Sequence, residues 1–250
     1  MKPIYSFIII SLVLLILAPH AGAQTFDGTN FSSDQPFFKV APYEFDKSEQ
    51  YFIFFKTDSL VMRELVPEPL TPLGDEMSLF FAKHHLVSPF KLDYHEVYFL
   101  IPVRFGDTKG TYMPVLYLDN AAGIIPGREI VGYNKVGGDI HFAEAGKNVN
   151  ITLAQNDTVL IRAEFKIGIK LSPDRASGDG WSFNLKYIPS ALEDTEAEVK
   201  QLVRAKYTDK GVEKLRFAKA DLKFTPTHLN PLDKIPVIRI TQSGYIVGSS

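Results

Sequence analysis

Lys135 is the residue whose surroundings most suggest covalent chemistry, because it lies in a glycine-rich segment spanning residues 127–138. Glycines on both sides of a lysine let the backbone bend and approach a ligand closely. Val131, Tyr133 and Val136 would make the surroundings apolar, and burial lowers the pKa of an amine because desolvation disfavours its charged form. A lysine that is neutral near neutral pH can attack a ketone and form an imine. These residues alone also allow an ordinary surface lysine in a loop.

Histidines supply the candidate metal ligands, at His84-His85, His95 and His141. Their spacing matches no standard site, and the sequence contains no H-E-x-x-H motif. It also contains no phosphate-binding G-x-x-x-x-G-K-[ST] loop and no G-x-S-x-G nucleophile elbow. Asp119-Asn120 is most simply a helix cap. We therefore expect neither a metal nor an organic cofactor.

The composition is that of an ordinary globular protein with enough apolar material for a sizeable core. The chain has 250 residues, of which 45% are apolar and 22% are charged. The formal net charge of −2 argues against binding to nucleic acid or to anionic membranes through bulk charge. Since there is no cysteine, disulfides, thiolate metal sites and a cysteine nucleophile are excluded.

The N-terminus has the three parts of a secretory signal peptide: a basic start, a short apolar centre and an A-x-A ending before Gln24. An uncleaved anchor is the alternative. We expect a signal peptide over residues 1–23, cleaved after Ala23, a polar leader over 24–40 and one domain over 41–250. The mature protein would then be secreted or periplasmic, with no membrane segment.

The domain is dense in short apolar and alternating runs that favour β-strands. Asp58 can cap a short helix over residues 60–65 that stops before Pro67, and residues 121–132 predict a helix or tight turn. The runs predict one mainly β (α+β) domain with a mostly antiparallel, barrel-like or folded sheet. Strands are expected over residues 51–55, 77–82, 96–105, 112–118, 149–153, 159–169, 181–187, 198–207, 215–224 and 235–240.

Several motifs occur in the order found in the acetoacetate decarboxylase family, which the chain resembles over roughly residues 40–250. No single motif is specific, but the collinear set is. The matching segments are Val66-Pro67-Glu68-Pro69-Leu70, Glu96 before Ile101-Pro102-Val103, Gly110-x-Tyr112, Tyr117-Leu118-Asp119-Asn120, Gly127-Arg128-Glu129, Tyr133-x-Lys135, Leu185-Lys186-Tyr187-Ile188-Pro189, and Pro231-Leu232 with Pro236-Val237.

The resemblance implies an antiparallel β cone or barrel around an apolar cavity, assembled into homo-oligomers. It implies that Lys135 is the Schiff-base lysine and that Glu96 is the second catalytic residue, placed to orient groups or transfer protons. Tyr133 and Tyr112 would contact a small-molecule oxo acid or ketone substrate. No cofactor is implied.

Four positions differ from the family pattern. Val136 stands where a second lysine is usual, and Asn134 replaces the proline before Lys135. Residues 48–50 contain no arginine to hold a substrate carboxylate. Phe80-Phe81 replaces an expected glutamate and would make the substrate site more apolar.

Three functions are compatible with this pattern. The first is a lysine Schiff-base decarboxylase that releases CO2 and a ketone from a β-oxo acid. The missing arginine motivates the second, a Schiff-base aldolase or dehydratase acting on an oxo acid. The third is an exported, non-catalytic protein that binds an apolar small molecule in the cavity.

Overall fold

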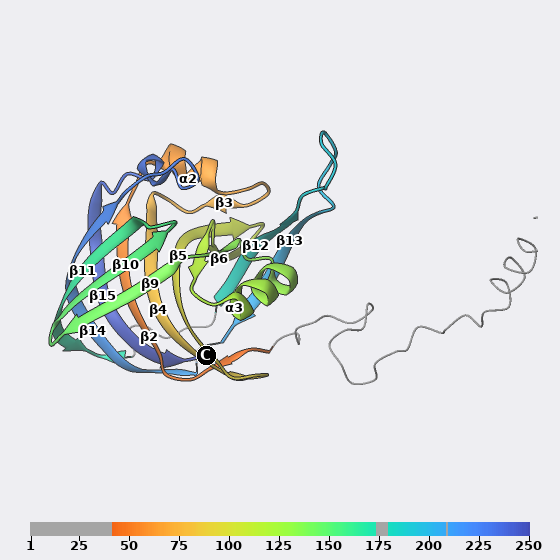
Figure 1. Cartoon of the computed structure of the whole chain (residues 1–250). Coiled ribbons are helices and arrows are strands. Elements are labelled where there is room, and N and C mark those ends of the chain that lie inside the picture. Colours follow the sequence, from red (N-terminus) through yellow and green to blue (C-terminus); the bar gives the residue numbers. More distant parts are fainter. Residues whose placement is uncertain (1–41, 174–179, 209) are drawn as a thin grey trace, which may run out of the picture. The chain divides into compact units, whose positions relative to one another are not determined.

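A computed structural model describes residues 42–173, 180–208 and 210–250, which form a mostly β domain (Figure 1). The expected signal peptide and leader lie outside these residues. No helix in the described part of the chain is long and apolar enough to span a membrane. The strands are β1 (Glu44–Phe45), β2 (Ser48–Lys56), β3 (Thr71–Pro72), β4 (Glu76–Ser88), β5 (Leu92–Phe105), β6 (Thr108–Tyr112), β7 (Leu116–Leu118), β8 (Lys135–Gly137), β9 (Asp139–Ala145), β10 (Asn148–Gln155), β11 (Thr158–Leu171), β12 (Gly180–Ile188), β13 (Val199–Tyr207), β14 (Gly211–Phe224) and β15 (Arg239–Ser249).

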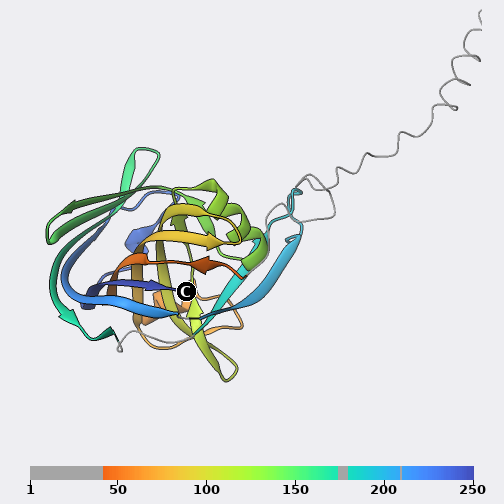
Figure 2. The same cartoon turned by 90° about the horizontal axis from the view of Figure 1, so that it is seen from below.

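These strands join in one large, strongly curved sheet (Figure 1; Figure 2). Its order is β13-β12-β6-β5-β4-β2-β15-β14-β11-β10-β9, and β7 extends from β5 to pair with β8. Most neighbours are antiparallel, whereas β12–β6 and β7–β8 are parallel. The expectation of a mainly antiparallel fold is confirmed. The expectation of a barrel is corrected, because β9 and β13 remain unpaired edges among the described residues and the sheet stays open.

Helices are few and short in the described part of the chain. Helix α2 (Ser59–Leu65) begins at Asp58, whose Oδ1 accepts a hydrogen bond from the backbone N–H of Leu60 at 2.8 Å. Helix α3 (Ala121–Pro126) begins at Asn120 and continues into a π-helical turn, η1 (Gly127–Val131). A 3-10 turn, η3 (Leu232–Lys234), follows later. The two caps predicted from the sequence are therefore confirmed.

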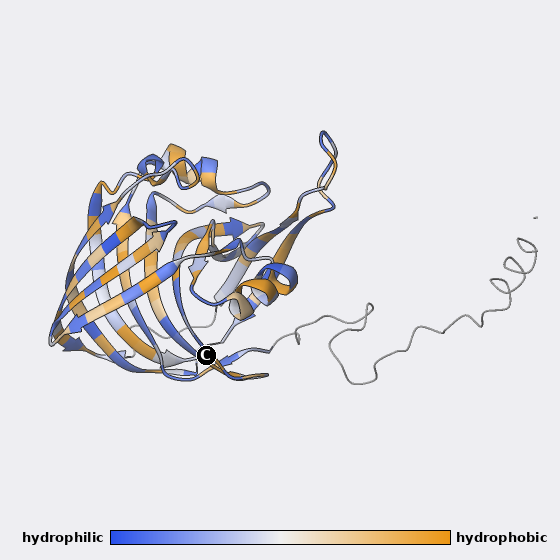
Figure 3. Ribbon diagram, in the orientation of Figure 1, coloured by the Kyte–Doolittle hydropathy of each residue, from blue (hydrophilic) through white to orange (hydrophobic). Residues whose placement is uncertain are grey.

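The strand predictions were largely confirmed, with three differences. The run 112–118 splits into β6 and β7 around Pro114, which has no N–H for the ladder. The run 235–240 is mostly irregular, and the strand is instead β15, beginning at Arg239. Strands β1, β3, β8 and β9 were not predicted. The alternation expected along β11 is present from Ile161 to Phe165, since the buried residues Ile161, Ala163 and Phe165 are separated by exposed Arg162 and Glu164, and Figure 3 shows such banding along the long strands.

Strands β4 and β5 are buried on both faces, and each face packs against a different cluster. Successive side chains of a strand point to opposite faces. Phe81 on β4 and Val97 and Phe99 on β5 enter the main core, with Tyr51, Ile53 and Phe55 of β2. Phe80, Ala82, Tyr94 and Tyr98 belong to a smaller cluster with Leu116 and Leu118 of β7. We call these the core face and the site face, because Glu96 lies on the second.

Candidate active site

Lys135 is the first residue of β8, and its side chain is only 8% exposed. Strand β8 runs parallel to β7, with Leu116 opposite Lys135, and the carbonyl oxygen of Lys135 accepts a hydrogen bond from Arg128 Nη1 at 2.9 Å. Gly132 ends the preceding π-helical turn at φ 79°, a left-handed conformation that favours glycine. These features direct the lysine from β8 onto the site face.

Gly127 leaves the space that the lysine side chain occupies. A Cβ at Gly127 would lie 2.5 Å from Lys135 Cδ and 2.7 Å from Cε, well inside van der Waals contact. The glycine-rich segment therefore does more than bend the backbone, because one of its glycines packs directly against the side chain of Lys135.

Glu96 forms a buried ion pair with Lys135. Its Oε1 lies 3.1 Å from Lys135 Nζ, and both side chains are less than a tenth exposed. Glu96 is on β5 opposite Leu118, so β7 separates the strands that carry the two charges. Residues 39 positions apart in the sequence thus meet through the order β5–β7–β8.

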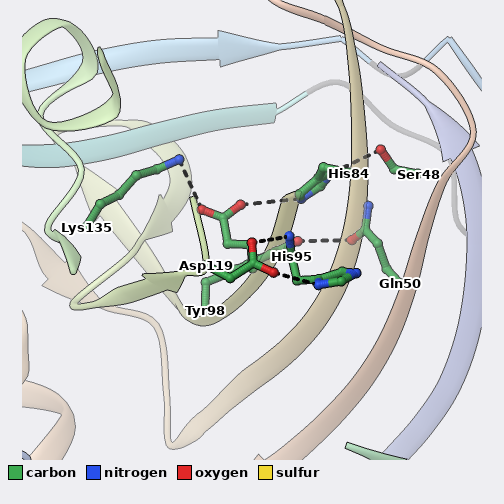
Figure 4. Close-up of polar contacts among 8 residues, drawn as sticks. Ser48, Gln50, His84, His95, Tyr98, Asp119 and Lys135 are labelled. Atoms are coloured by element: carbon green, nitrogen blue, oxygen red, sulfur yellow. Dashed lines mark hydrogen bonds and ion pairs between the residues drawn. The ribbon is translucent and has the colours of Figure 1, made fainter. Parts of the chain in front are cut away.

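His84 and Ser48 continue this pair into a polar chain (Figure 4). The Nε2 of His84 lies 3.3 Å from Glu96 Oε2, and its Nδ1 lies 3.0 Å from Ser48 Oγ. The histidine comes from β4 and the serine from β2, so four separate strands contribute to Lys135–Glu96–His84–Ser48. From the sequence, His84 was expected only as a possible metal ligand, and no role was expected for Ser48.

The charges around Glu96 keep it ionised. Burial raises the pKa of Glu96, but the Lys135 ammonium and the hydrogen bond and charge of His84 outweigh burial, so the pKa lies below its ordinary value. Lys135 Nζ also lies 5.6 Å from the ring centroids of both Tyr94 and Tyr133. Aromatic faces favour a cation through their quadrupole, so a positive nitrogen is well accommodated here.

Lys135 opens onto a cavity of about 590 Å³ with a predominantly apolar wall. Tyr94 and Tyr133 line it beside the lysine, and the rest of the wall comes from β1, the β4–β5 turn, helix α3, η1 and the end of β13. The apolar residues of the wall include Phe45, Leu86, Phe90, Leu92, Ala122, Pro126, Val131 and Ala205.

Three of the residues expected to bind substrate do not line this cavity. Phe81 and Tyr112 are buried in the main core on the other face of the sheet. Phe80 is on the site face, where its ring stacks on Tyr98 with centroids 5.2 Å apart. The difference between adjacent Phe80 and Phe81 follows from the two-residue period of a strand.

The segment that lacks the expected arginine supplies neutral groups instead. Ser48 contacts His84, and Gln50 Oε1 accepts a hydrogen bond from Tyr98 at 3.0 Å (Figure 4). Val136, in place of the second lysine, points away from Lys135 and packs against the main core. No arginine belongs to the described residues that line the cavity.

The other histidines do not converge on a metal site. His95, next to Glu96, points to the opposite face, where its Nδ1 lies 2.7 Å from Asp119 Oδ2. Within residues 42–173, 180–208 and 210–250, no group of three histidine or carboxylate side chains could hold a metal ion.

The open β-sheet, the apolar cavity and the buried lysine–carboxylate pair define a small-molecule site with a candidate amine nucleophile. The family model for acetoacetate decarboxylase matches residues 30–249, and the chain belongs to this family. It is 30% identical over 216 residues to the acetoacetate decarboxylase of Clostridium acetobutylicum, covering 85% of this chain and 87% of that protein. It is also 30% identical over 218 residues to the Burkholderia ambifaria enzyme, covering 85% and 86%.

Solved structures agree on the fold. One acetoacetate decarboxylase structure has a TM-score of 0.77 at 27% identity, covering 88% of this chain and 91% of that one. The Legionella pneumophila acetoacetate decarboxylase has a TM-score of 0.78 at 22% identity, covering 88% and 90%. The enduracididine biosynthesis enzyme MppR, complexed with pyruvate, has a TM-score of 0.72 at 16% identity, covering 86% and 89%. The family recognised from the motifs is therefore confirmed.

Proposed function

We propose that this chain is a lysine Schiff-base decarboxylase of a β-oxo acid. The proposal rests on the position of the Lys135 amine. It is buried, it lies 3.1 Å from Glu96 Oε1, and it opens onto an apolar cavity. Membership of the acetoacetate decarboxylase family supports an enzyme of this type.

The reaction begins when Lys135 loses a proton and its neutral Nζ attacks the ketone carbon. Return of one proton and loss of water then give a protonated imine. The bond between the α-carbon and the carboxylate then breaks, and its electron pair moves towards the imine nitrogen. CO2 leaves, the resulting enamine takes a proton at carbon, and water hydrolyses the imine to release the ketone and the free amine. Covalent catalysis of this kind divides one difficult step into easier ones.

Glu96 contributes by stabilising positive charge at the lysine nitrogen. Because the pKa of Glu96 is lowered, its carboxylate is negative when the imine nitrogen is positive. A fixed charge in a site shielded from water is worth more than the same charge in bulk solvent. The positive nitrogen is the electron sink for decarboxylation, so an ionised Glu96 favours formation of the protonated imine from which CO2 is then lost.

The proposal is tested by trapping the imine. The protein is incubated with β-oxo acids and borohydride, and its intact mass is measured together with CO2 release. We expect the mass of a reduced ketone adduct on the wild type and on Lys206→Ala, which removes another lysine of the cavity wall. The Lys135→Ala variant should give none. An adduct that persists in Lys135→Ala would contradict the proposal, and so would the absence of any adduct; a copurifying apolar ligand would then favour the binding protein.

A Schiff-base aldolase or dehydratase is the second candidate, favoured by the absence of arginine from the described cavity wall. A related fold, MppR, has been seen with the condensation product of pyruvate and imidazole 4-carboxaldehyde. The two candidates share the imine and differ in the bond that is made or broken. Comparing CO2 release with carbon–carbon bond formation from the same oxo acid separates them.

We also propose that the chain is exported and that its mature form begins at Gln24, on the evidence of the sequence of residues 1–23. Intact mass of the protein purified from its own host tests this. The homo-oligomer implied by the family resemblance is tested by light scattering on the same sample.

A further inference from the structure

The cavity beside Lys135 is much larger than a four-carbon oxo acid requires. Its volume of about 590 Å³ falls within the range of about 300–1,000 Å³ typical of sites for drug-sized ligands. Lys135 meets the buried carboxylate of Glu96 at this cavity, and the other charged residues of the wall are Glu44, which lies 3.3 Å from Lys210 in an ion pair, and Lys206. Imine formation at Lys135 does not by itself require the rest of this volume.

The wall beyond the lysine is suited to hydrocarbon. Phe45 of β1, Leu86 of β4 and Leu92 of β5 line one part of it, and Pro126 and Val131 line the part next to Gly127. Leu86 is only 5% exposed, so the cavity has a side chain of the protein interior in its wall. An apolar substituent bound here would remove its own surface and that of the cavity wall from water, which is favourable.

An aromatic surface connects this wall to the reacting nitrogen. Phe45 and Tyr94 meet edge to face with ring centroids 6.5 Å apart, and Lys135 Nζ lies 5.6 Å from Tyr94. A substrate bound as an imine at Lys135 would therefore extend its ketone substituent along aromatic and aliphatic side chains. Glu96 would face the nitrogen itself.

We propose that the substrate is a β-oxo acid whose ketone carries a long aliphatic or aromatic substituent, rather than acetoacetate. This inference rests on the proposed function. The carbonyl carbon lies at Lys135 Nζ, and the substituent fills the cavity between β1, β5 and helix α3. The covalent steps are those given above, with a long-chain or aryl ketone as the product.

The test compares the kcat/KM of CO2 release from 3-oxooctanoate, benzoylacetate and acetoacetate. We expect at least about a tenfold advantage for one or both larger acids, since even one methylene in a hydrophobic pocket is worth about that factor. If acetoacetate is the best of the three, the inference is overturned while the proposed function stands. If no acid gives CO2 or a borohydride adduct, the proposed function itself fails.

A variant that fills the cavity tests whether the preference for the larger acids arises there. Ala122→Phe places a ring in the wall from helix α3, and we expect it to lower kcat/KM for the larger acids at least about tenfold more than kcat/KM for acetoacetate. Ala205→Phe on β13 is the second variant, used if the first does not fold. Ala191→Phe, at an exposed position outside the wall, is the matched control. Equal losses for all three acids in both filling variants would overturn the inference.

Binding without chemistry gives an independent measurement. Octanoate and butyrate have no ketone, so neither can form an imine with Lys135. Calorimetry with the full chain should show tighter binding of octanoate, and Ala122→Phe should abolish the difference. Equal affinities for the two acids in the wild type would contradict a long apolar subsite even if decarboxylation were observed.

Discussion

The two faces of β4 and β5 are both largely buried, but they differ in the kind of side chain that they contain. The core face is apolar where it meets the main core, with Phe81, Val97 and Phe99 all fully buried. The site face belongs to the same strands and is largely buried, although Phe80 is only partly so, and it contains the charged chain from Lys135 to Ser48. A buried charge is costly unless it is paired, so the site face retains polar groups at the expense of stability.

The comparison also explains why neighbouring residues have unrelated roles. Lys135 enters the site, whereas Val136 packs against the main core. Glu96 likewise enters the site, whereas Val97 is in the core. The strand period places chemistry and packing at alternate positions, so a shift of one residue in register would exchange the two faces.

The largest difference is expected between Phe81→Ala and Phe80→Ala. Phe81 is fully buried in the main core, and its truncation should lower the free energy of unfolding by about 3–5 kcal/mol. Phe80 is only partly buried beside Tyr98, so its truncation should cost clearly less. Urea denaturation of both variants measures the difference. Equal losses would mean that the two faces do not differ in packing as the structure indicates.

Gly127→Ala should damage the site while sparing the core. Gly127 has φ −61°, which alanine adopts readily, so the strain falls on the Lys135 side chain 2.5 Å away. We expect kcat/KM for the best β-oxo acid to fall about 100-fold, because small displacements of a reacting group have effects of that size. The unfolding free energy should change by no more than about 1 kcal/mol.

Gly137→Ala is the matched control for this substitution. A Cβ there would meet only Ile124 Cδ1 at 4.0 Å, an ordinary contact, although the residue lies two positions from Lys135. Its activity should stay close to that of the wild type. Comparable losses in both variants would show that glycine is needed for the backbone rather than for room around the lysine.

Some of this arrangement could be predicted from the sequence, for identifiable physical reasons. The helix after Asp58 follows from a local cap, and Lys135 and Glu96 follow from motifs read in order. Phe80 and Phe81 could not be separated, because both are apolar and a strand buried on two faces shows no alternation. His84 meets Ser48 only through the register of β4 against β2 and β5, which local sequence does not determine.

The open sheet was beyond sequence reasoning for a similar reason. Whether β9 and β13 pair depends on the curvature of the whole sheet rather than on either strand. The start of β15 was misplaced because its first residues are largely polar, whereas the preceding apolar run is interrupted by Pro236. Most of the other differences between the predicted and the observed sheet and site arise from interactions between segments that are distant in the sequence.

His84→Ala tests whether the site face depends on its polar chain. His84 lowers the pKa of Glu96 through a hydrogen bond and its charge, so removing it should raise that pKa and move the acid limb of the kcat/KM profile to higher pH. We expect a loss of about tenfold in kcat/KM, the size of one charged hydrogen bond. His84→Gln, which keeps a donor, should recover part of it.

The neighbouring histidine provides the control for this pH profile. His85 is exposed, and its Nδ1 lies 2.9 Å from Asp93, away from Glu96. His85→Ala should leave the acid limb where it is in the wild type. A carboxyl whose pKa is lowered in the folded state stabilises the fold above the unfolded value of about 4.3, and this stabilisation is lost as pH falls. His84→Ala should therefore be less stable than the wild type near neutral pH, and the difference between the two should shrink as pH falls through the acid range.

The smallest expected effect concerns a tyrosine of the core face. Tyr117 lies on β7 between Leu116 and Leu118 of the site face, and its hydroxyl donates a hydrogen bond to Asn230 Oδ1 at 2.8 Å. Burial raises the pKa of Tyr117 to about 12, above its ordinary value near 10. The folded state therefore keeps the proton when the unfolded state has lost it, and stability present below about pH 10 is lost as pH rises towards 12.

Tyr117→Phe removes both the hydrogen bond and this titration. At neutral pH we expect a loss of about 0.5–1.5 kcal/mol in the unfolding free energy, and a shallower decline of stability between pH 10 and 12 than in the wild type. Tyr187→Phe, at a position that is 50% exposed, is the control and should change neither quantity appreciably. Because Tyr117 packs in the core face, kcat/KM should be almost unchanged in Tyr117→Phe. A loss of activity comparable to that of His84→Ala would show that the two faces are coupled through β7.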